Sequence, residues 1–185
     1  MIIGIDVGGS AKGFHLAQLE SGASEIQDLA HGATVAEVVV RLKSVARILI
    51  VAIDCPPRAQ LTGALTRAAE RELHRRGFRV QWTRRQSHEP AEWMHNGERL
   101  WRALAEEFPK VAIIETFPTV AVTSLATSAV TMPLHLLSQH ADRRDWKDFV
   151  DACICCEVGS RYLRGDANAV GVSEGDPDEL GPIWY

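Results

Sequence analysis

The sequence has no long hydrophobic run. Its longest apolar stretches, such as residues 48–53, have the length of a strand, whereas a membrane-spanning helix needs roughly 20 consecutive apolar residues. The first six residues lack the positively charged start of a secretory signal and already reach an acidic residue, Asp6. We therefore expect no membrane span and no signal peptide, and we expect residues 2–7 to form a first strand.

Cysteine is scarce and badly spaced for a disulfide framework. Three of the four cysteines, Cys153, Cys155 and Cys156, fall within one predicted helix. This spacing indicates a reducing compartment and predicts a cytoplasmic protein. Cys153 and Cys156 lie one helical turn apart, which leaves a zinc site open, but no second ligand pair with suitable spacing accompanies them. The other interpretation is that the cysteines are small buried hydrophobic side chains.

An excess of positive charge is also missing. The formal net charge is −4, which argues against strong nonspecific binding to nucleic acid, because phosphate binding depends on clustered Lys and Arg. One stretch beside Trp82 is nevertheless basic and contains Arg71, Arg75, Arg76, Arg79, Arg84 and Arg85. A solvated helix face and loop is the favoured interpretation of this stretch, and a nucleic acid or nucleotide partner stays open.

The patterns that are present predict an α/β fold in a single domain over residues 1–185. Strand-like runs at 2–7, 14–19 and 25–29 predict an antiparallel meander. Runs without alternation at 47–54 and 111–115 are typical of central strands covered on both faces. Helical spacing marks residues 35–45, 61–76, 90–108 and 146–163. We expect a mixed five-stranded sheet with helices on both faces and a helical insertion or enlarged edge at about 61–108.

An acidic residue closes each of three apolar strands: Asp6, Asp54 and Glu115. If these strands are parallel neighbours, their carboxylates meet at the carboxyl edge of the sheet, where open α/β sheets bind ligands. Asp148 and Asp151 lie three residues apart on the last helix and share a neighbouring face. Taken singly, each carboxylate is also a common turn former or helix cap, so the argument depends on their combination.

Hard oxygen ligands of this kind suit Mg²⁺ or Mn²⁺. Two such ions about 4 Å apart activate a water and stabilise the leaving oxygen in phosphodiester hydrolysis. We therefore predict a metal-dependent hydrolase in which Asp6, Asp54, Glu115 and Asp151 are catalytic. The same four residues and Asp148 are the predicted metal ligands.

Several motifs together resemble a known family. They are GIDVGG at 4–9 with KG at 12–13, AIDCPP at 52–57, RAAEREL at 67–73, IETFPT at 114–119 and DFVDA at 148–152. This combination, which spans nearly the whole chain, resembles the family labelled domain of unknown function 429, whose members are regarded as predicted nucleases with an RNase H-like fold. Cys55 departs from the pattern, since a small residue such as Ala is commoner there.

The resemblance implies an RNase H-like sheet order and a nuclease that acts on a nucleic acid or nucleotide. It assigns Asp6, Asp54, Glu115 and Asp151 to the acidic positions of the first, fourth and fifth strands and the final helix. It also places Arg67 and Arg71 in a basic helix motif, where they contact phosphate or pair with neighbouring glutamates. Lys12 is a further candidate for phosphate contact.

Two other functions stay open. Residues 6–10 also resemble the first phosphate motif of sugar kinases and actin-like ATPases, which share the RNase H-like core. Those enzymes close two such domains over a nucleotide, and this sequence has no second phosphate loop of that type. The other alternative is a non-catalytic binding protein on the same core, which is disfavoured because all four acidic positions are filled.

Overall fold

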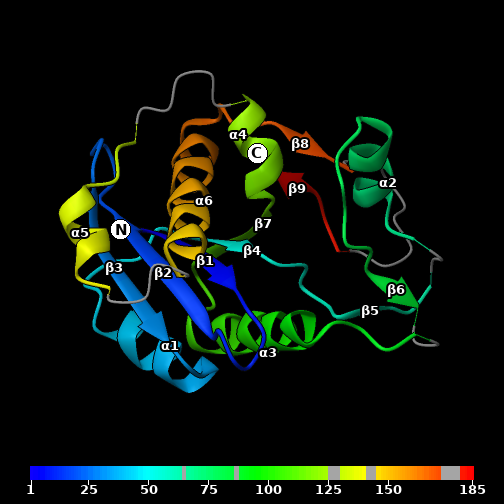
Figure 1. Ribbon diagram of the computed structural model, residues 1–185, viewed down its shortest axis with the longest axis horizontal. Coiled ribbons are helices and arrows are strands. Elements are labelled where there is room, and N and C mark those ends of the chain that lie inside the picture. Colours follow the sequence, from blue (N-terminus) through cyan, green and yellow to red (C-terminus); the bar gives the residue numbers. More distant parts are fainter. Residues whose placement is uncertain (64–65, 86–87, 125–129, 141–144, 172–179) are drawn as a thin grey trace.

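The structure, a computed structural model, describes residues 1–63, 66–85, 88–124, 130–140, 145–171 and 180–185. The strands are β1 (Ile2–Val7), β2 (Phe14–Leu19), β3 (Ile26–Gly32), β4 (Ile50–Asp54), β5 (Gln60–Leu61), β6 (Arg84–Arg85), β7 (Ala112–Thr116), β8 (Ala169–Val170) and β9 (Ile183–Trp184). The helices are α1 (Val35–Lys43), α2 (Ala68–Arg75), α3 (Glu92–Glu107), α4 (Pro118–Ser124), α5 (Leu134–Ser138) and α6 (Trp146–Arg164). The arrangement is α/β, as predicted (Figure 1).

The main sheet is antiparallel at one side and parallel in its centre. Its strand order is β3-β2-β1-β4-β7-β9-β8. The pairs β1/β2 and β2/β3 are antiparallel, which confirms the predicted meander, and β4 runs parallel to both β1 and β7. Over the described residues the sheet has seven strands, not the five expected. The sequence missed β8 and β9 because strands of two residues are too short to show an alternating pattern.

Helices cover both faces of this sheet. α6 packs across β1, β2 and β4 on one face, and α1 and α3 pack against each other on the opposite face (Figure 1). Because successive side chains of a strand point to opposite faces, Ile2 belongs to the core under α6, whereas Ile3 and Ile5 belong to the core under α1 and α3. A sheet buried on both sides explains why the central strands read as continuous apolar runs.

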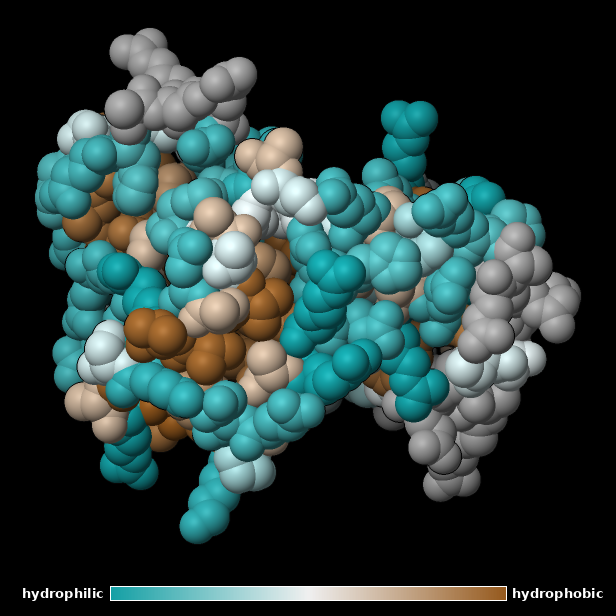
Figure 2. All heavy atoms as spheres, turned by 90° about the horizontal axis from the view of Figure 1, so that it is seen from below, coloured by the Kyte–Doolittle hydropathy of each residue, from teal (hydrophilic) through white to brown (hydrophobic). Residues whose placement is uncertain are grey.

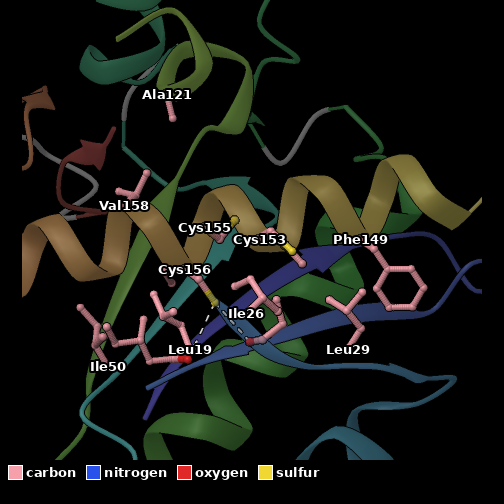
Figure 3. Packing of buried hydrophobic residues seen from close by; sticks show 14 of the residues in the cluster. Leu19, Ile26, Leu29, Ile50, Ala121, Phe149, Cys153, Cys155, Cys156 and Val158 are labelled. Carbon is pink, nitrogen blue, oxygen red and sulfur yellow. Dashed lines mark hydrogen bonds between the residues drawn. The ribbon is translucent and has the colours of Figure 1, made fainter. Parts of the chain in front are cut away.

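α6 approaches β1 more closely than a side chain at Gly4 would allow. A Cβ at Gly4 would lie 2.0 Å from the carbonyl oxygen of Ala152 and 2.7 Å from the backbone nitrogen of Cys156. Cys156 is buried in this contact, and its Sγ donates to the carbonyl oxygen of Ala17 over 3.3 Å, as the dashed lines in Figure 3 mark. The close contact fixes the position of the first turns of α6 relative to the end of β1.

We expect Gly4→Ala to lower the free energy of unfolding by about 1–3 kcal/mol, because the new methyl group meets backbone atoms that cannot rotate away. Urea denaturation followed by circular dichroism measures the change. Gly159→Ala is the matched control in the same helix-to-sheet contact, since its Cβ would meet only side-chain atoms, the nearest at 3.0 Å. Equal stability losses in the two variants would contradict the close approach at Gly4.

The predicted helix at 61–76 is shorter in the structure. Leu61 belongs to β5, which pairs with β6, and α2 begins only at Ala68. Arg67 precedes the helix in an extended conformation, φ −75° and ψ 140°, and its side chain is fully buried. The helix therefore begins one residue after a buried arginine in extended conformation.

The range predicted as an insertion, about 61–108, divides into two parts in space. α2, β5 and β6 stand beyond the sheet, on the right of Figure 1. α3 instead packs on the sheet, where Leu100 and Leu104 join the core under α1 and α3. The single-domain organisation and the limits of the insertion stay a prediction.

Apolar side chains are exposed on the outer surface below the sheet. Figure 2 shows this side, with apolar side chains concentrated in the left half of the view and a mainly hydrophilic surface on the right. Val40 of α1 is 70% exposed.

Within the part of the chain that the structure describes, no helix combines the length and apolarity needed to cross a bilayer.

Candidate metal centre

Asp6 and Asp54 stand side by side at the ends of adjacent parallel strands. Asp6 pairs in register with Asp54 across β1 and β4. Residues two positions apart on a strand point the same way, so both carboxylates lie on the face that α6 covers, in line with Ile2 and Ile50. Asp148 and Asp151 approach from the first turns of α6, which lie above this end of the sheet.

Two groups of side chains bring possible ligand atoms within 4.8 Å of one another. The first group is Asp6, Asp54 and Asp151, and the second is Asp6, His15 and Asp148. Asp6 belongs to both groups. The structure thus brings together four of the predicted metal ligands, Asp6, Asp54, Asp148 and Asp151, and adds an imidazole to them.

Glu115 does not join these groups, although it was predicted as a ligand. It pairs with Ile53 and not with Asp54, so its side chain leaves the opposite face of the sheet. There the Nη1 of Arg67 donates to its Oε1 over 2.7 Å, and Nη2 lies 2.5 Å from Oε2. Both residues are buried, Arg67 completely and Glu115 to 6% exposure. The sequence predicted that Glu115 ends its strand at this edge of the sheet, but its side chain lies on the face opposite to the carboxylates of Asp6 and Asp54.

The three predicted phosphate contacts lie in different surroundings. Arg67 is enclosed between Glu115 and the carbonyl oxygen of Gly181, to which its Nη2 donates over 2.9 Å, so a phosphate cannot reach it in this conformation. Arg71 is exposed, donates to the carbonyl oxygen of Thr66 and does not line the pocket beside the carboxylates. Lys12 does line that pocket, and its Nζ donates to Oδ2 of Asp148 over 2.6 Å.

The carboxylates open into a pocket of about 400 Å³. Asp6, Asp54 and Asp148 line it together with Lys12 and with Glu115. Its lining also includes apolar and basic side chains from α2, the segment after α2, α3 and the end of β7, namely Leu73, Arg79, Val80, Trp93 and Phe117. This volume lies within the range of small-ligand sites.

The clustered carboxylates carry more negative charge than the neighbouring lysines, Lys12 and Lys147, offset. Burial raises the pKa of Asp6 to about 7, and the charges of Asp148 and Asp151 contribute to the rise. Burial, followed by the charges of Asp6 and Asp151, raises the pKa of Asp54 well above its usual value. Lys147, which pairs with Asp151 on α6, lowers both pKa values only in part. A divalent cation is the species that would supply the missing charge.

We expect divalent metal to stabilise the protein more at about pH 8 than at about pH 5. The pKa of Asp6 is about 7 in the folded protein and 3.8 for the unperturbed group. The folded state therefore binds the proton more tightly than the unfolded state does, and without metal its stability falls as the pH rises from about 4 to about 7. A cation bound to the ionised carboxylate offsets this loss.

The measurement is the change in melting temperature on adding Mn²⁺ at each pH. In Asp6→Asn the difference between the two pH values should shrink, because the titrating ligand is gone. The exposed Asp166, at the far end of α6, provides the control variant Asp166→Asn, which should behave as the native chain. An equal Mn²⁺ effect at both pH values in the native chain would contradict the expectation.

His15 is the site residue that the sequence did not predict. It lies on β2 directly opposite Asp6, is fully buried, and places Nδ1 3.8 Å from Oδ2 of Asp6. The sequence does contain a signal for it, because the turn at 8–13 joins Val7 to its partner Phe14, which sets Asp6 opposite His15. That pairing becomes visible only when the register of the hairpin is known.

Glu70 is a second buried carboxylate that the sequence did not assign to the site. It lines the same pocket, and its Oε1 accepts a hydrogen bond from the backbone nitrogen of Thr83 over 3.0 Å. Burial raises the pKa of Glu70 to about 7, although the hydrogen bonds from Thr83 oppose the rise. The sequence had offered Glu70 only as an ion-pair partner for the arginines of α2.

Three comparisons with known proteins gave no match: no family model, no curated protein and no solved structure matches the chain. The resemblance to the family labelled domain of unknown function 429 therefore stays a prediction.

Proposed function

We propose that the protein is a metal-dependent phosphodiesterase on an RNase H-like core, which cleaves a nucleic acid or nucleotide with Mg²⁺ or Mn²⁺. The observation that carries the proposal is the convergence of Asp6, Asp54 and Asp151 within 4.8 Å at one end of the sheet. The succession of β3, β2 and β1, antiparallel, followed by the parallel strands β4 and β7, supports the RNase H-like core. Membership of the resembling family is part of the same proposal.

The chain's own residues have distinct roles in this reaction. Asp6, Asp54 and Asp151 hold the cation with carboxylate oxygens, the ligands that Mg²⁺ and Mn²⁺ prefer. When bound, the cation provides a hydroxide from water and neutralises the charge that develops on the phosphate. The ammonium group of Lys12 stands at the same pocket and can contact a phosphate oxygen. No side-chain nucleophile is needed.

The pocket supports a substrate that presents one nucleotide unit at a time. Its volume of about 400 Å³ fits a small ligand. Val80 and Trp93 supply apolar surface for a base near the carboxylates, and Arg79 supplies a positive charge at the pocket. This arrangement favours a strand end, an unpaired nucleotide or a small phosphodiester.

The turn after β1 favours hydrolysis over the kinase-like alternative. Phosphate loops direct backbone N–H groups at the ligand. Here the backbone nitrogen of Gly8 donates to the carbonyl of Gly13 over 2.8 Å, and those of Lys12 and Gly13 donate to the carbonyl of Gly9 over 2.9 Å. These donors are used within the turn and do not serve a phosphate.

Calorimetric titration with Mg²⁺ and Mn²⁺ tests the proposal, together with cleavage assays on labelled single-stranded, duplex and branched DNA, on RNA and on a dinucleotide. We expect binding and cleavage in the native chain and the loss of both in Asp6→Asn and Asp151→Asn. Asp166→Asn should retain both. If the native chain binds no divalent ion, even with nucleic acid present, the proposal is wrong and the non-catalytic binding protein becomes the leading alternative.

A further inference from the structure

One buried imidazole faces the carboxylate cluster without a hydrogen bond. The side chain of His15 is 0% exposed, and in the described part of the chain neither of its ring nitrogens has a hydrogen-bond partner. Phe149 contacts the ring edge to face at 4.8 Å, and the ring of His31 lies 5.1 Å away. These contacts hold the ring in place but satisfy neither nitrogen. Buried polar groups are rarely left without a partner, so the position of His15 calls for an explanation.

The nitrogens of His15 lie at ligand spacing from neighbouring carboxylates. Nδ1 is 3.8 Å from Oδ2 of Asp6, and Nε2 is 4.0 Å from Oδ1 of Asp145. Both distances are too long for a hydrogen bond. Bonds from a metal ion to imidazole nitrogen and to carboxylate oxygen are each about 2.0–2.2 Å. Two ligands of one ion therefore stand about 3–4 Å apart, which is the separation between His15 and Asp6.

We propose that Asp6, His15 and Asp148 form a binding site for a first-row transition metal ion, with Mn²⁺ or Zn²⁺ bound in preference to Mg²⁺. Possible ligand atoms of these three residues lie within 4.8 Å of one another. Imidazole nitrogen favours transition metals, whereas sites made of oxygen alone suit Mg²⁺. The inference rests on the proposed function in one respect, because both use Asp6 as a metal ligand.

Asp6 belongs to both groups of possible ligands. The proposed site therefore lies next to the three carboxylates of Asp6, Asp54 and Asp151. The centre would then have two metal positions that share the carboxylate of Asp6. The position with carboxylates alone would accept Mg²⁺, and the position that includes His15 would select a transition metal. The two positions would thus respond differently to the two kinds of ion.

Lys12 already places a positive charge where the ion would bind. Its Nζ lies 2.6 Å from Oδ2 of Asp148, and its side chain is 55% exposed, whereas that of Asp148 is 7% exposed. A partly exposed lysine can move into solvent when a cation takes its place, while the buried aspartate stays. Lys12 thus acts as the counter-ion of Asp148 in the absence of metal.

Pulsed electron paramagnetic resonance of the Mn²⁺-loaded native chain tests the site directly, because a coordinated imidazole couples its ¹⁴N nucleus to the manganese spin. We expect this coupling in the native chain and its persistence in excess Mg²⁺. His15→Phe should remove the coupling and weaken Mn²⁺ binding at least about tenfold, with little change in Mg²⁺ binding. His31→Gln changes the adjacent imidazole, which belongs to neither metal group, and should retain the coupling.

The outcomes separate this inference from the proposed function. Mn²⁺ bound without ¹⁴N coupling in the native chain overturns the imidazole ligand and leaves a carboxylate-bound metal intact. Coupling that persists in His15→Phe also overturns it, since another histidine would then be the ligand. The absence of any Mn²⁺ binding overturns this inference, and it overturns the proposed function as well if Mg²⁺ does not bind either. The native-chain experiment decides the question even if His15→Phe fails to fold.

Discussion

Replacing Asp54 with asparagine is expected to abolish metal-dependent cleavage and, at the same time, to stabilise the metal-free protein. The rate should fall at least about 10³-fold, because a lost metal ligand removes several kcal/mol of transition-state stabilisation. Stability should change in the opposite direction. Burial and the charges of Asp6 and Asp151 raise the pKa of Asp54 well above its usual value, so ionising this carboxyl at neutral pH is costly in the folded state. Asparagine has nearly the same shape and no charge.

We expect the gain in the free energy of unfolding to be about 0.5–2 kcal/mol at about pH 8, the range usual for substitutions that relieve a strained functional site. At about pH 5 the gain should be smaller, because a pKa raised in the folded state makes the stability of the native chain fall progressively as the pH rises. Urea denaturation without metal measures the stability, and cleavage with Mn²⁺ measures the rate. Asp166→Asn, which alters an exposed carboxylate, should change neither.

The two measurements together decide the role of Asp54. A variant that keeps more than about a tenth of the native rate would show that Asp54 is not a metal ligand. A variant that loses activity and stability together would show that the carboxylate supports the fold. Only loss of activity with a gain in stability fits a carboxylate that is maintained for its chemistry.

The central strands and two of the acidic residues could be predicted from the sequence because each signal is local. A continuous apolar run followed by proline defines the end of β4, and β1 is a similar run that ends at the glycine-rich turn. Asp6 and Asp54 come at corresponding positions of these strands, and the parallel pairing of β1 and β4 is in register there. Expecting the two carboxylates to be neighbours was therefore sound.

Glu115 shows where that argument fails. Its strand also ends in a carboxylate, but β7 pairs with β4 so that Glu115 lies beside Ile53, one residue before Asp54. A shift of one residue moves a side chain to the other face of a sheet. The register between two strands that are joined through a long insertion is not encoded in either strand alone, so the sequence could not assign the face.

His15 and Arg67 were missed or misplaced for a related reason, because the role of each depends on residues that are distant in the sequence. His15 gains its place through Asp148 and Phe149 of α6, and Arg67 through Glu115, 48 positions away in the chain. Local pattern predicted a basic helix at 61–76. In the structure α2 begins only at Ala68, and Arg67, which precedes it, is completely buried.

We expect Arg67→Met to lower the free energy of unfolding by about 3–5 kcal/mol, because it leaves the carboxylate of Glu115 buried without its partner. The double variant Arg67→Met/Glu115→Leu should recover most of this loss, since replacing both members of a buried ion pair with apolar groups is often neutral. Urea denaturation of both single variants and the double variant, analysed as a double-mutant cycle, measures the coupling. Arg71→Met, which changes an exposed arginine of the helix that follows Arg67, should change the stability by less than about 0.5 kcal/mol.

The cycle also separates the ion pair of Arg67 from its bonds to the C-terminal segment. Its Nη2 donates to the carbonyl oxygen of Gly181 over 2.9 Å, just before β9, whose Ile183 pairs with Glu115. A double variant as unstable as Arg67→Met would show that the contacts of Arg67 outside the ion pair, this bond to the C-terminal segment among them, account for the loss. If Arg67→Met instead keeps its stability and loses cleavage, the phosphate contact predicted from the sequence becomes the better account of Arg67, and the buried pair would have to open when substrate binds.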